Sequence, residues 1–208
     1  MLRKISNFAA EMVYIEDQIW DFDLAAALQQ VSSQRREQAL GFKHELGQRQ
    51  CVLAYLLLKK ALFKEYGICE NVTFDYGEHG KPVLVEYPTI HFNLSHCREA
   101  VACVVSDHPV GIDVESVRRP LRESLVRYAM SEEEQHTIFS AEDPELEFTR
   151  LWTMKEARLK LTGEGLAHRL KTVLEEPGFR FETGAADTFL WALCEAETNS
   201  QTRATFSL

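Results

Sequence analysis

The chain has 208 residues, of which 45% are hydrophobic and 26% charged, a composition typical of a folded globular protein and not of a disordered one. Its formal net charge is −9, so the molecule as a whole repels nucleic acid, and we expect no nucleic-acid partner. The longest apolar run, residues 51–58, is too short to span a bilayer, and residues 1–17 lack a signal-peptide core, so no membrane association is expected. The five cysteines include no C-x-x-C pair, which fits a reducing cytoplasm.

In the first half, the pattern predicts helices followed by short strands. Helices are predicted over 24–40 and 48–66, and Gly67 is expected to end the second in the left-handed conformation. The predicted strands are 72–76, a stretch around Val83, 90–95, 100–106 and 110–117. The last of them follows a short turn at 107–109 and is expected to extend an antiparallel meander.

The second half repeats this order. Helices are predicted over 120–130 and 131–140, and a third is expected to start at the cap Asp143, with Pro144 in first position, and to end before Gly163. The predicted strands are 179–182, 188–195 and 203–207. We therefore expect an α+β fold of two similar lobes, 1–106 and 107–208, related by pseudo-two-fold symmetry. In each lobe a long helix packs on a small antiparallel sheet, and ligands commonly bind in the crevice between such lobes.

The segment 110–115 (VGIDVE) alternates as a strand with one buried face does. Its branched apolar residues face the core, so Gly111, Asp113 and Glu115 share the other face, and the glycine is expected to leave room there for a bulky ligand. Two neighbouring carboxylates repel each other unless water or a cation neutralises them, and Mg²⁺ prefers such oxygens together with substrate phosphates. A half-exposed strand with a hydrated face explains the same residues.

The segment 148–160 (FTRLWTMKEARLK) has apolar residues at helical spacing. The predicted buried stripe consists of Phe148, Leu151, Trp152 and Leu159. Glu156 and Lys160 lie one turn apart at the edge of that stripe, where a third metal ligand and a phosphate partner are possible roles. An ordinary Glu–Lys helix pair explains them as well.

The segment 92–96 (FNLSH) ends a predicted strand, with Lys81 a short distance upstream. Ser95, His96 and Lys81 can all donate hydrogen bonds to phosphate oxygens, although turn formation also explains polar residues here. The stretch 77–82 (GEHGKP) is not a P-loop, because its glycines are only three apart and a proline stands where Ser or Thr is required.

In this order, FNLSH, GIDVE and WTMKEARLK resemble the motifs of the 4′-phosphopantetheinyl transferase superfamily, in particular the larger pseudo-dimeric type that activates surfactin synthetase. The resemblance covers residues 35–166 and is strongest over 80–166. It implies a monomeric, Mg²⁺-dependent enzyme that transfers the phosphopantetheine arm of coenzyme A to a serine of an acyl or peptidyl carrier protein, releasing 3′,5′-ADP.

The resemblance also implies roles for individual residues. The implied Mg²⁺ ligands are Asp113, Glu115 and Glu156. The implied contacts to coenzyme A phosphates are Lys81, Ser95, His96 and Lys160, with Arg49 near the adenosine 3′-phosphate. Relatives carry a lysine-rich patch where this chain has Arg35 and Arg36, and no phosphate contact is assigned there.

The resemblance makes Glu134 the candidate base for the attacking serine, because the family pattern has a glutamate shortly after the G-x-D-x-E strand. Lys160 is expected to stabilise the charge on the leaving group. Ser131 and Glu134 also fit a capping box, which explains the glutamate without catalysis. Glu132, Glu133 and a metal-bound water are the alternative bases.

Carrier domains are typically acidic, so we expect them to dock at the basic stretch that follows the strand of Asp113 and Glu115, which consists of Arg118, Arg119 and Arg122. A solvated helix face explains these arginines as well. Two other functions fit the same residues: a Mg²⁺-dependent phosphodiesterase acting on coenzyme A, and a non-catalytic carrier-binding protein. The sequence does not specify the natural carrier or the tolerance for acylated coenzyme A.

Overall fold

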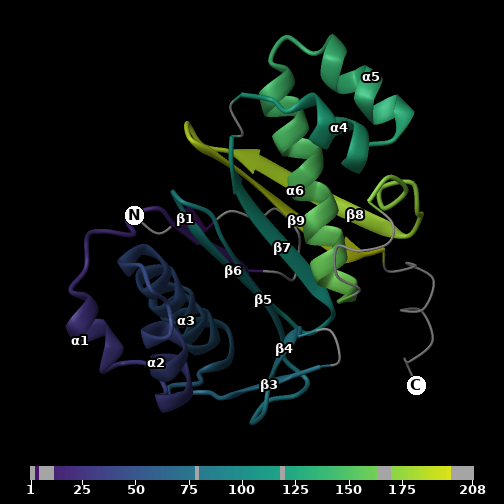
Figure 1. The fold of residues 1–208 in the computed structure, drawn as a ribbon. Coiled ribbons are helices and arrows are strands. Elements are labelled where there is room, and N and C mark those ends of the chain that lie inside the picture. Colours follow the sequence, from purple (N-terminus) through teal and green to yellow (C-terminus); the bar gives the residue numbers. More distant parts are fainter. Residues whose placement is uncertain (1–2, 5–11, 78–79, 118–119, 164–169, 198–208) are drawn as a thin grey trace, which may run out of the picture.

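A computed structural model describes residues 3–4, 12–77, 80–117, 120–163 and 170–197 (Figure 1). The helices are α1 (Leu24–Leu28), α2 (Ser33–Leu40), α3 (Glu45–Tyr66), α4 (Glu123–Ala129), α5 (Glu132–Ser140) and α6 (Pro144–Thr162). The strands are β1 (Arg3–Lys4), β2 (Met12–Glu16), β3 (Phe74–Tyr76), β4 (Pro82–Leu84), β5 (His91–His96), β6 (Val101–Ser106), β7 (Val110–Ser116), β8 (Phe179–Ala185) and β9 (Phe189–Ala196). Helices combined with antiparallel sheets confirm the α+β class.

The ends of the long helices follow their capping residues. Gly67 and Gly163 end α3 and α6 in the left-handed conformation, with φ of 71° and 75°. Asp143 caps α6 by accepting a hydrogen bond from the backbone of Leu146 at 3.0 Å. The helix predicted over 24–40 is instead two helices, because the hydroxyl of Ser32 caps a new start at α2.

The strands form three sheets, in the orders β1-β2-β6-β5, β3-β4 and β7-β9-β8. The expected continuation of the meander into β7 is wrong, because β6 already pairs with β2 on one side and β5 on the other. After the turn, β7 pairs with β9 in a separate sheet. Strands β1 and β2 were not predicted, and the strand expected over 203–207 lies outside the described residues.

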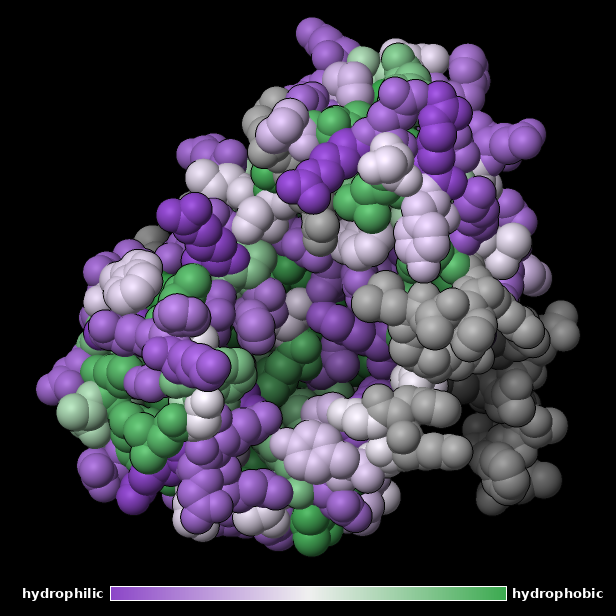
Figure 2. All heavy atoms as spheres, viewed as in Figure 1, coloured by the Kyte–Doolittle hydropathy of each residue, from purple (hydrophilic) through white to green (hydrophobic). Residues whose placement is uncertain are grey.

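Helix α3, the four-stranded sheet, the three-stranded sheet and α6 follow one another as layers (Figure 1). In the space-filling view, hydrophilic side chains gather in a recess between the part formed by α1 to α3 and the part formed by α4 to α6 (Figure 2). A functional site between these parts is therefore accessible to a polar ligand.

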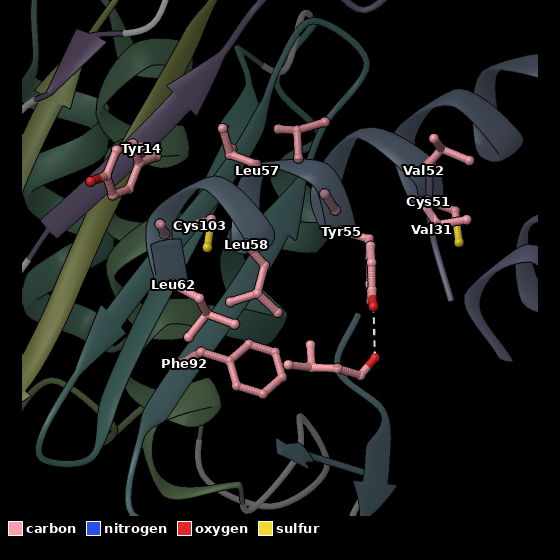
Figure 3. Packing of buried hydrophobic residues seen from close by; sticks show 14 of the residues in the cluster. Tyr14, Val31, Cys51, Val52, Tyr55, Leu57, Leu58, Leu62, Phe92 and Cys103 are labelled. Carbon is pink, nitrogen blue, oxygen red and sulfur yellow. Dashed lines mark hydrogen bonds between the residues drawn. The ribbon is translucent and has the colours of Figure 1, made fainter. Parts of the chain in front are cut away.

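The core between α3 and the four-stranded sheet is closely packed (Figure 3). Leu58 and Leu62 of α3 meet Phe92 and Cys103 of the sheet, and all four are almost fully buried. Tyr55 is also buried, and its hydroxyl donates to the backbone oxygen of Val72 at 2.7 Å. Because the tyrosine oxygen has a partner, its burial leaves no polar group unsatisfied.

The other faces of the two larger sheets share a second core. Residues from both sheets form it: Val13, Ile15, Ala102 and Val104 from one, and Val110, Ile112, Val114, Phe189, Trp191 and Leu193 from the other. The predicted inward face of β7 is thus confirmed. On the outside of the three-stranded sheet, α6 packs through Ala157 and Leu161.

Strands β5 and β7 lie side by side, and side chains link them. The side-chain Oδ1 of Asn93 accepts a hydrogen bond from the backbone nitrogen of Ile112 at 2.9 Å, and the hydroxyl of Ser95 accepts one from the backbone nitrogen of Val114 at 3.2 Å. Residue numbers rise together along both strands, so the two run parallel. We call this contact the β5–β7 seam.

None of the described helices is long and apolar enough to cross a membrane. The division into lobes 1–106 and 107–208 stays a prediction.

Gly111 corrects one expectation about the carboxylate face of β7. The glycine was expected to leave room for a ligand, but α6 fills that room. A Cβ atom at this position would lie 2.1 Å from the backbone oxygen of Ala157 and 2.5 Å from the backbone nitrogen of Leu161. The glycine therefore allows α6 to approach β7 closely.

We expect Gly111→Ala to lower the free energy of unfolding by about 3 kcal/mol, because the backbone of α6 must move to admit the methyl group. Urea denaturation measures this change. Gly77→Ala is the matched control, because its added Cβ would meet only the backbone oxygen of Lys81 at 3.8 Å. Equal stability of the two variants would contradict the close approach of α6.

Candidate active site

Ser95 lies at the centre of a small buried network. Its hydroxyl donates to Asp113 Oδ1 at 2.7 Å and accepts from Lys160 Nζ at 2.8 Å. Lys160 Nζ also lies 2.6 Å from Asp113 Oδ1. Three of the predicted site residues, from β5, β7 and α6, are thus in direct contact.

Asp113 is the most buried of the predicted metal ligands. Its side chain is only 5% exposed, yet Oδ2 has no hydrogen-bond partner within the described part of the chain. A buried carboxylate oxygen without a partner is unfavourable, and a hard cation removes that penalty. The carboxylate of Asp113 therefore fits a Mg²⁺ ligand.

The other two predicted ligands lie next to this network, on facing elements. The indole nitrogen of Trp152 donates to Glu115 Oε1 at 3.1 Å. Trp152, Glu156 and Lys160 follow one another at four-residue spacing, so they share one face of α6. Because Trp152 contacts Glu115 and Lys160 contacts Asp113, Glu156 lies between the two contacts along the helix.

Among the residues that the structure describes, no three acidic, histidine or cysteine side chains form a preassembled metal cluster. The three-carboxylate ligand set therefore stays a prediction.

Several cations gather around the Ser95 network. The pKa of His96 lies below its ordinary value, because protein atoms displace water from around the ring and because Lys160 and Arg35 lie close; Asp113 acts in the opposite direction. The charges of Lys160 and Arg35 thus act on one exposed histidine at the end of β5. Such a concentration of positive charge is suited to an anion.

Arg35, to which the sequence assigned no role, lies near enough to His96 for its charge to act on that ring. Its Nε donates to the backbone oxygen of Cys51 at 2.9 Å, and its Nη1 donates to Gln38 Oε1 at 2.8 Å. These contacts hold the guanidinium between α2 and α3, on the side of His96. The sequence contains both Arg35 and Arg36 and does not show which of them lies near the site. In the fold, Arg36 is directed elsewhere and donates to the backbone oxygen of Leu28.

Lys81 and Arg49 make contacts elsewhere. Lys81 Nζ donates to the backbone oxygen of Leu161 at 2.8 Å, at the C-terminal end of α6, and burial lowers its pKa. Arg49 Nε pairs with Glu45 at 2.8 Å, and its Nη1 donates to the backbone oxygen of Phe22 at 2.9 Å. The assignment of both residues to coenzyme A stays a prediction.

Glu134 has two structural partners. The predicted capping box is confirmed: its Oε2 accepts from the backbone of Ser131 at 2.7 Å, and its own backbone nitrogen donates to the Ser131 hydroxyl at 3.3 Å. Its Oε1 lies 2.7 Å from Nζ of Lys155, which is fully buried and also donates to the backbone oxygen of Leu170. These contacts account for Glu134 without catalysis, and its role as base stays a prediction.

A cavity of about 480 Å³ adjoins the predicted metal strand. Its lining consists of Glu115, Ser116, Val117, Pro120, Leu121, Arg122, Leu125 and Phe148. Arg122 is exposed, whereas Arg118 and Arg119 lie outside the described residues. The cavity is thus acidic at the metal strand, apolar along its wall and basic at Arg122.

Comparison with known proteins places this site in a family. Residues 109–204, which include β7 and α6, match the family model described as the 4′-phosphopantetheinyl transferase superfamily. The chain belongs to that superfamily.

Individual relatives carry names of the same kind. The chain is 35% identical over 145 residues to the 4′-phosphopantetheinyl transferase psf-1 of Bacillus pumilus, an alignment that covers 68% of this chain and 62% of that protein. It is 29% identical over 139 residues to the 4′-phosphopantetheinyl transferase Sfp of Bacillus subtilis strain 168, covering 66% and 62%. It is 41% identical over 93 residues to AcpT of Salmonella typhi, covering 42% and 48%. The chain thus spans less than two thirds of the length of these relatives.

Removing the charge of Glu134 should destabilise the protein. We expect Glu134→Gln to keep the capping hydrogen bond but to lower the free energy of unfolding by about 3 kcal/mol, because the buried ammonium of Lys155 loses its counter-charge. Chemical denaturation measures the loss. The double variant Glu134→Gln/Lys155→Met should recover most of it, since both charges are then absent.

The double variant also tests the catalytic role. If Glu134 is the base, its kcat falls roughly 10²–10⁴-fold despite the recovered stability. A double variant with normal activity removes Glu134 from the reaction, and a Glu134→Gln variant of unchanged stability contradicts the ion-pair argument.

Proposed function

We propose that this chain is a Mg²⁺-dependent 4′-phosphopantetheinyl transferase, which transfers the phosphopantetheine arm of coenzyme A to a serine of an apo-carrier protein and releases 3′,5′-ADP. The contact of Ser95, Asp113 and Lys160 supports this most directly. In this contact the buried carboxylate of Asp113, whose Oδ2 has no hydrogen-bond partner in the described part of the chain, touches the ammonium of Lys160. An ammonium group is a common partner of phosphate oxygens. The names of the relatives, both called 4′-phosphopantetheinyl transferases, support the same activity.

Asp113, Glu115 and Glu156 would hold the Mg²⁺. The ion would supply charge stabilisation for the phosphate oxygens as the pyrophosphate bond breaks. The ammonium of Lys160 would exchange part of its contact with Asp113 for a contact with a phosphate oxygen. The ammonium would then stabilise the leaving 3′,5′-ADP.

The reaction joins the serine oxygen of the carrier to the β-phosphorus of coenzyme A and breaks the bond from that phosphorus to the bridging oxygen. The serine proton passes to a base, for which Glu134 is the proposal, with Glu132, Glu133 and a metal-bound water as alternatives. Arg35 would add positive charge where the phosphates would bind, because its charge acts on His96 at the end of β5. The His96 ring, whose pKa is lowered, would contribute a hydrogen bond.

Lys81 and Arg49 are proposed contacts at the ends of coenzyme A. Lys81 would have to exchange the backbone oxygen of Leu161 for a phosphate oxygen, an exchange favoured by the charge of the phosphate. Arg49 is already engaged with Glu45 and a backbone oxygen, so its contact with the 3′-phosphate would likewise be an exchange.

The two halves are proposed to be pseudo-symmetric lobes of one monomeric, cytoplasmic enzyme. In support, α3 covers the outer face of one sheet as α6 covers that of the other. Ser95 and Lys81 from the first half approach α6 from the second, so a single chain supplies residues to both sides of the site.

The carrier is proposed to dock at the cavity beside Glu115. Apolar Leu121, Leu125 and Phe148 line it, and exposed Arg122 stands at its edge. An acidic carrier meets a basic residue there, next to the predicted metal ligand. Arg118 and Arg119 complete the proposed docking stretch.

The reaction itself is tested by mass spectrometry. With Mg²⁺, coenzyme A and an apo-carrier, transfer adds one phosphopantetheine to the carrier. A phosphodiesterase releases 3′,5′-ADP while the carrier mass stays unchanged, and a binding protein produces neither change. Either of those two results contradicts the proposal.

Asp113→Ala and Glu156→Ala should each reduce the transfer rate roughly 10²–10⁴-fold, because each removes one oxygen donor from the charge-stabilising site. Rates measured across Mg²⁺ concentrations, with melting temperatures to check the fold, give the result. Glu147→Ala is the control on the same helix, since Glu147 pairs with Arg150. Near-normal rates at limiting Mg²⁺ in either site variant would refute the ligand assignment.

Arg122→Ala should raise the KM for the carrier severalfold and weaken its dependence on salt, while the KM for coenzyme A stays constant. Arg127→Ala is the matched control. Arg127 lies in α4, which begins directly after the N-cap Arg122, but it pairs with Glu123 and does not line the cavity. Equal effects on both substrates, or equal effects of the two variants, would argue against docking at this cavity.

A further inference from the structure

The proposed metal site contains two carboxylates that receive different hydrogen-bond donors. Asp113 contacts the ammonium of Lys160, which neutralises much of its charge. Glu115 receives a hydrogen bond at 3.1 Å from the indole nitrogen of Trp152, a neutral donor. A neutral donor orients a carboxylate without cancelling its negative charge.

The indole of Trp152 has little freedom to move. Its side chain is 9% exposed and belongs to the core formed by α4, α5 and α6. Its ring stacks on Phe148, with centroids 6.0 Å apart and an interplanar angle of 30°. Because packing holds the ring, the direction of its N–H group is determined before any ligand binds.

An indole nitrogen can only donate, and a buried N–H group needs an acceptor. The contact to Glu115 satisfies that need across the interface of α6 with β7. It also restricts the rotamers of a flexible, half-buried glutamate, whose ordering would otherwise oppose metal binding. The same interaction thus serves both residues.

We propose that Trp152 is a positioning residue, which holds Glu115 in the orientation required for the divalent cation. This inference rests on the proposed metal site. Groups that hold metal ligands in place typically change metal affinity 10–100-fold when removed, while the ligand itself remains.

The test compares Trp152→Phe with the wild-type protein. Phenylalanine keeps an aromatic ring in the core but has no N–H group. Mn²⁺ affinity is measured by electron paramagnetic resonance in the presence of coenzyme A, with protein-free coenzyme A as the blank. We expect the Kd for Mn²⁺ to rise roughly 10-fold or more. The apparent KM for Mg²⁺ in the transfer assay should rise in parallel, and kcat at saturating Mg²⁺ should change much less.

Two controls separate positioning from packing. Trp191→Phe makes the same substitution at another buried tryptophan, in the core between the sheets, and should leave the Kd for Mn²⁺ unchanged. In a Glu115→Ala background, Trp152→Phe should have no further effect on the Kd, because the group that it positions is already absent.

The outcomes distinguish this inference from the proposed function. If the wild-type protein binds no Mn²⁺ and transfers without metal, the metal site and this inference both fail. If the wild type binds Mn²⁺ and Trp152→Phe binds it equally well, only the inference fails. An undiminished effect in the Glu115→Ala background would also overturn it, because the tryptophan would then act through packing alone.

Discussion

The hydroxyl of Ser95 joins three elements at one point. Its single proton goes to Asp113, and its oxygen accepts from the backbone of Val114 and from Lys160. A hydroxyl has one donor and two acceptor positions, so all of its hydrogen-bonding capacity is used. The same group therefore holds β5 against β7, orients the buried carboxylate and places the lysine of α6. The relative positions of Asp113 and Lys160 depend on this alignment.

Two buried charges have opposite consequences in this fold. The ammonium of Lys155 has a carboxylate and a backbone oxygen as partners, and together they hold α5 against α6. Asp113 retains one oxygen without a partner in the described part of the chain. A buried ion pair satisfies both of its charges, whereas an unsatisfied buried oxygen can accept a ligand. Two buried charges can thus differ in how completely their polar atoms are satisfied.

The sequence predicted the elements that short-range signals define. Asp143, Pro144 and Gly163 mark the ends of α6, and alternation along β7 separates its core face from its carboxylate face. Contacts between distant segments could not be predicted this way. The β5–β7 seam depends on two side chains bonding to a strand about twenty residues away, and no local period reports such a contact.

Gly111 illustrates the same limit. Alternation places Gly111 on the carboxylate face of β7, but the pattern does not show which element covers that face. In the structure, the backbone of α6 covers it at Gly111. Arg35 shows that the sequence pattern is limited in the same way for the candidate site. Only the packing of α2 on α3 distinguishes it from its neighbour Arg36 and brings its charge near His96.

The core shared by the two sheets makes the halves of the chain dependent on each other. Val13, Ile15, Ala102 and Val104 are buried only because residues of the three-stranded sheet cover them. A fragment ending after β6 would present this apolar face to water, which favours aggregation over independent folding. The protein should therefore melt in one cooperative transition, with the halves separating and unfolding together. A site built at their junction exists only while the whole chain is folded.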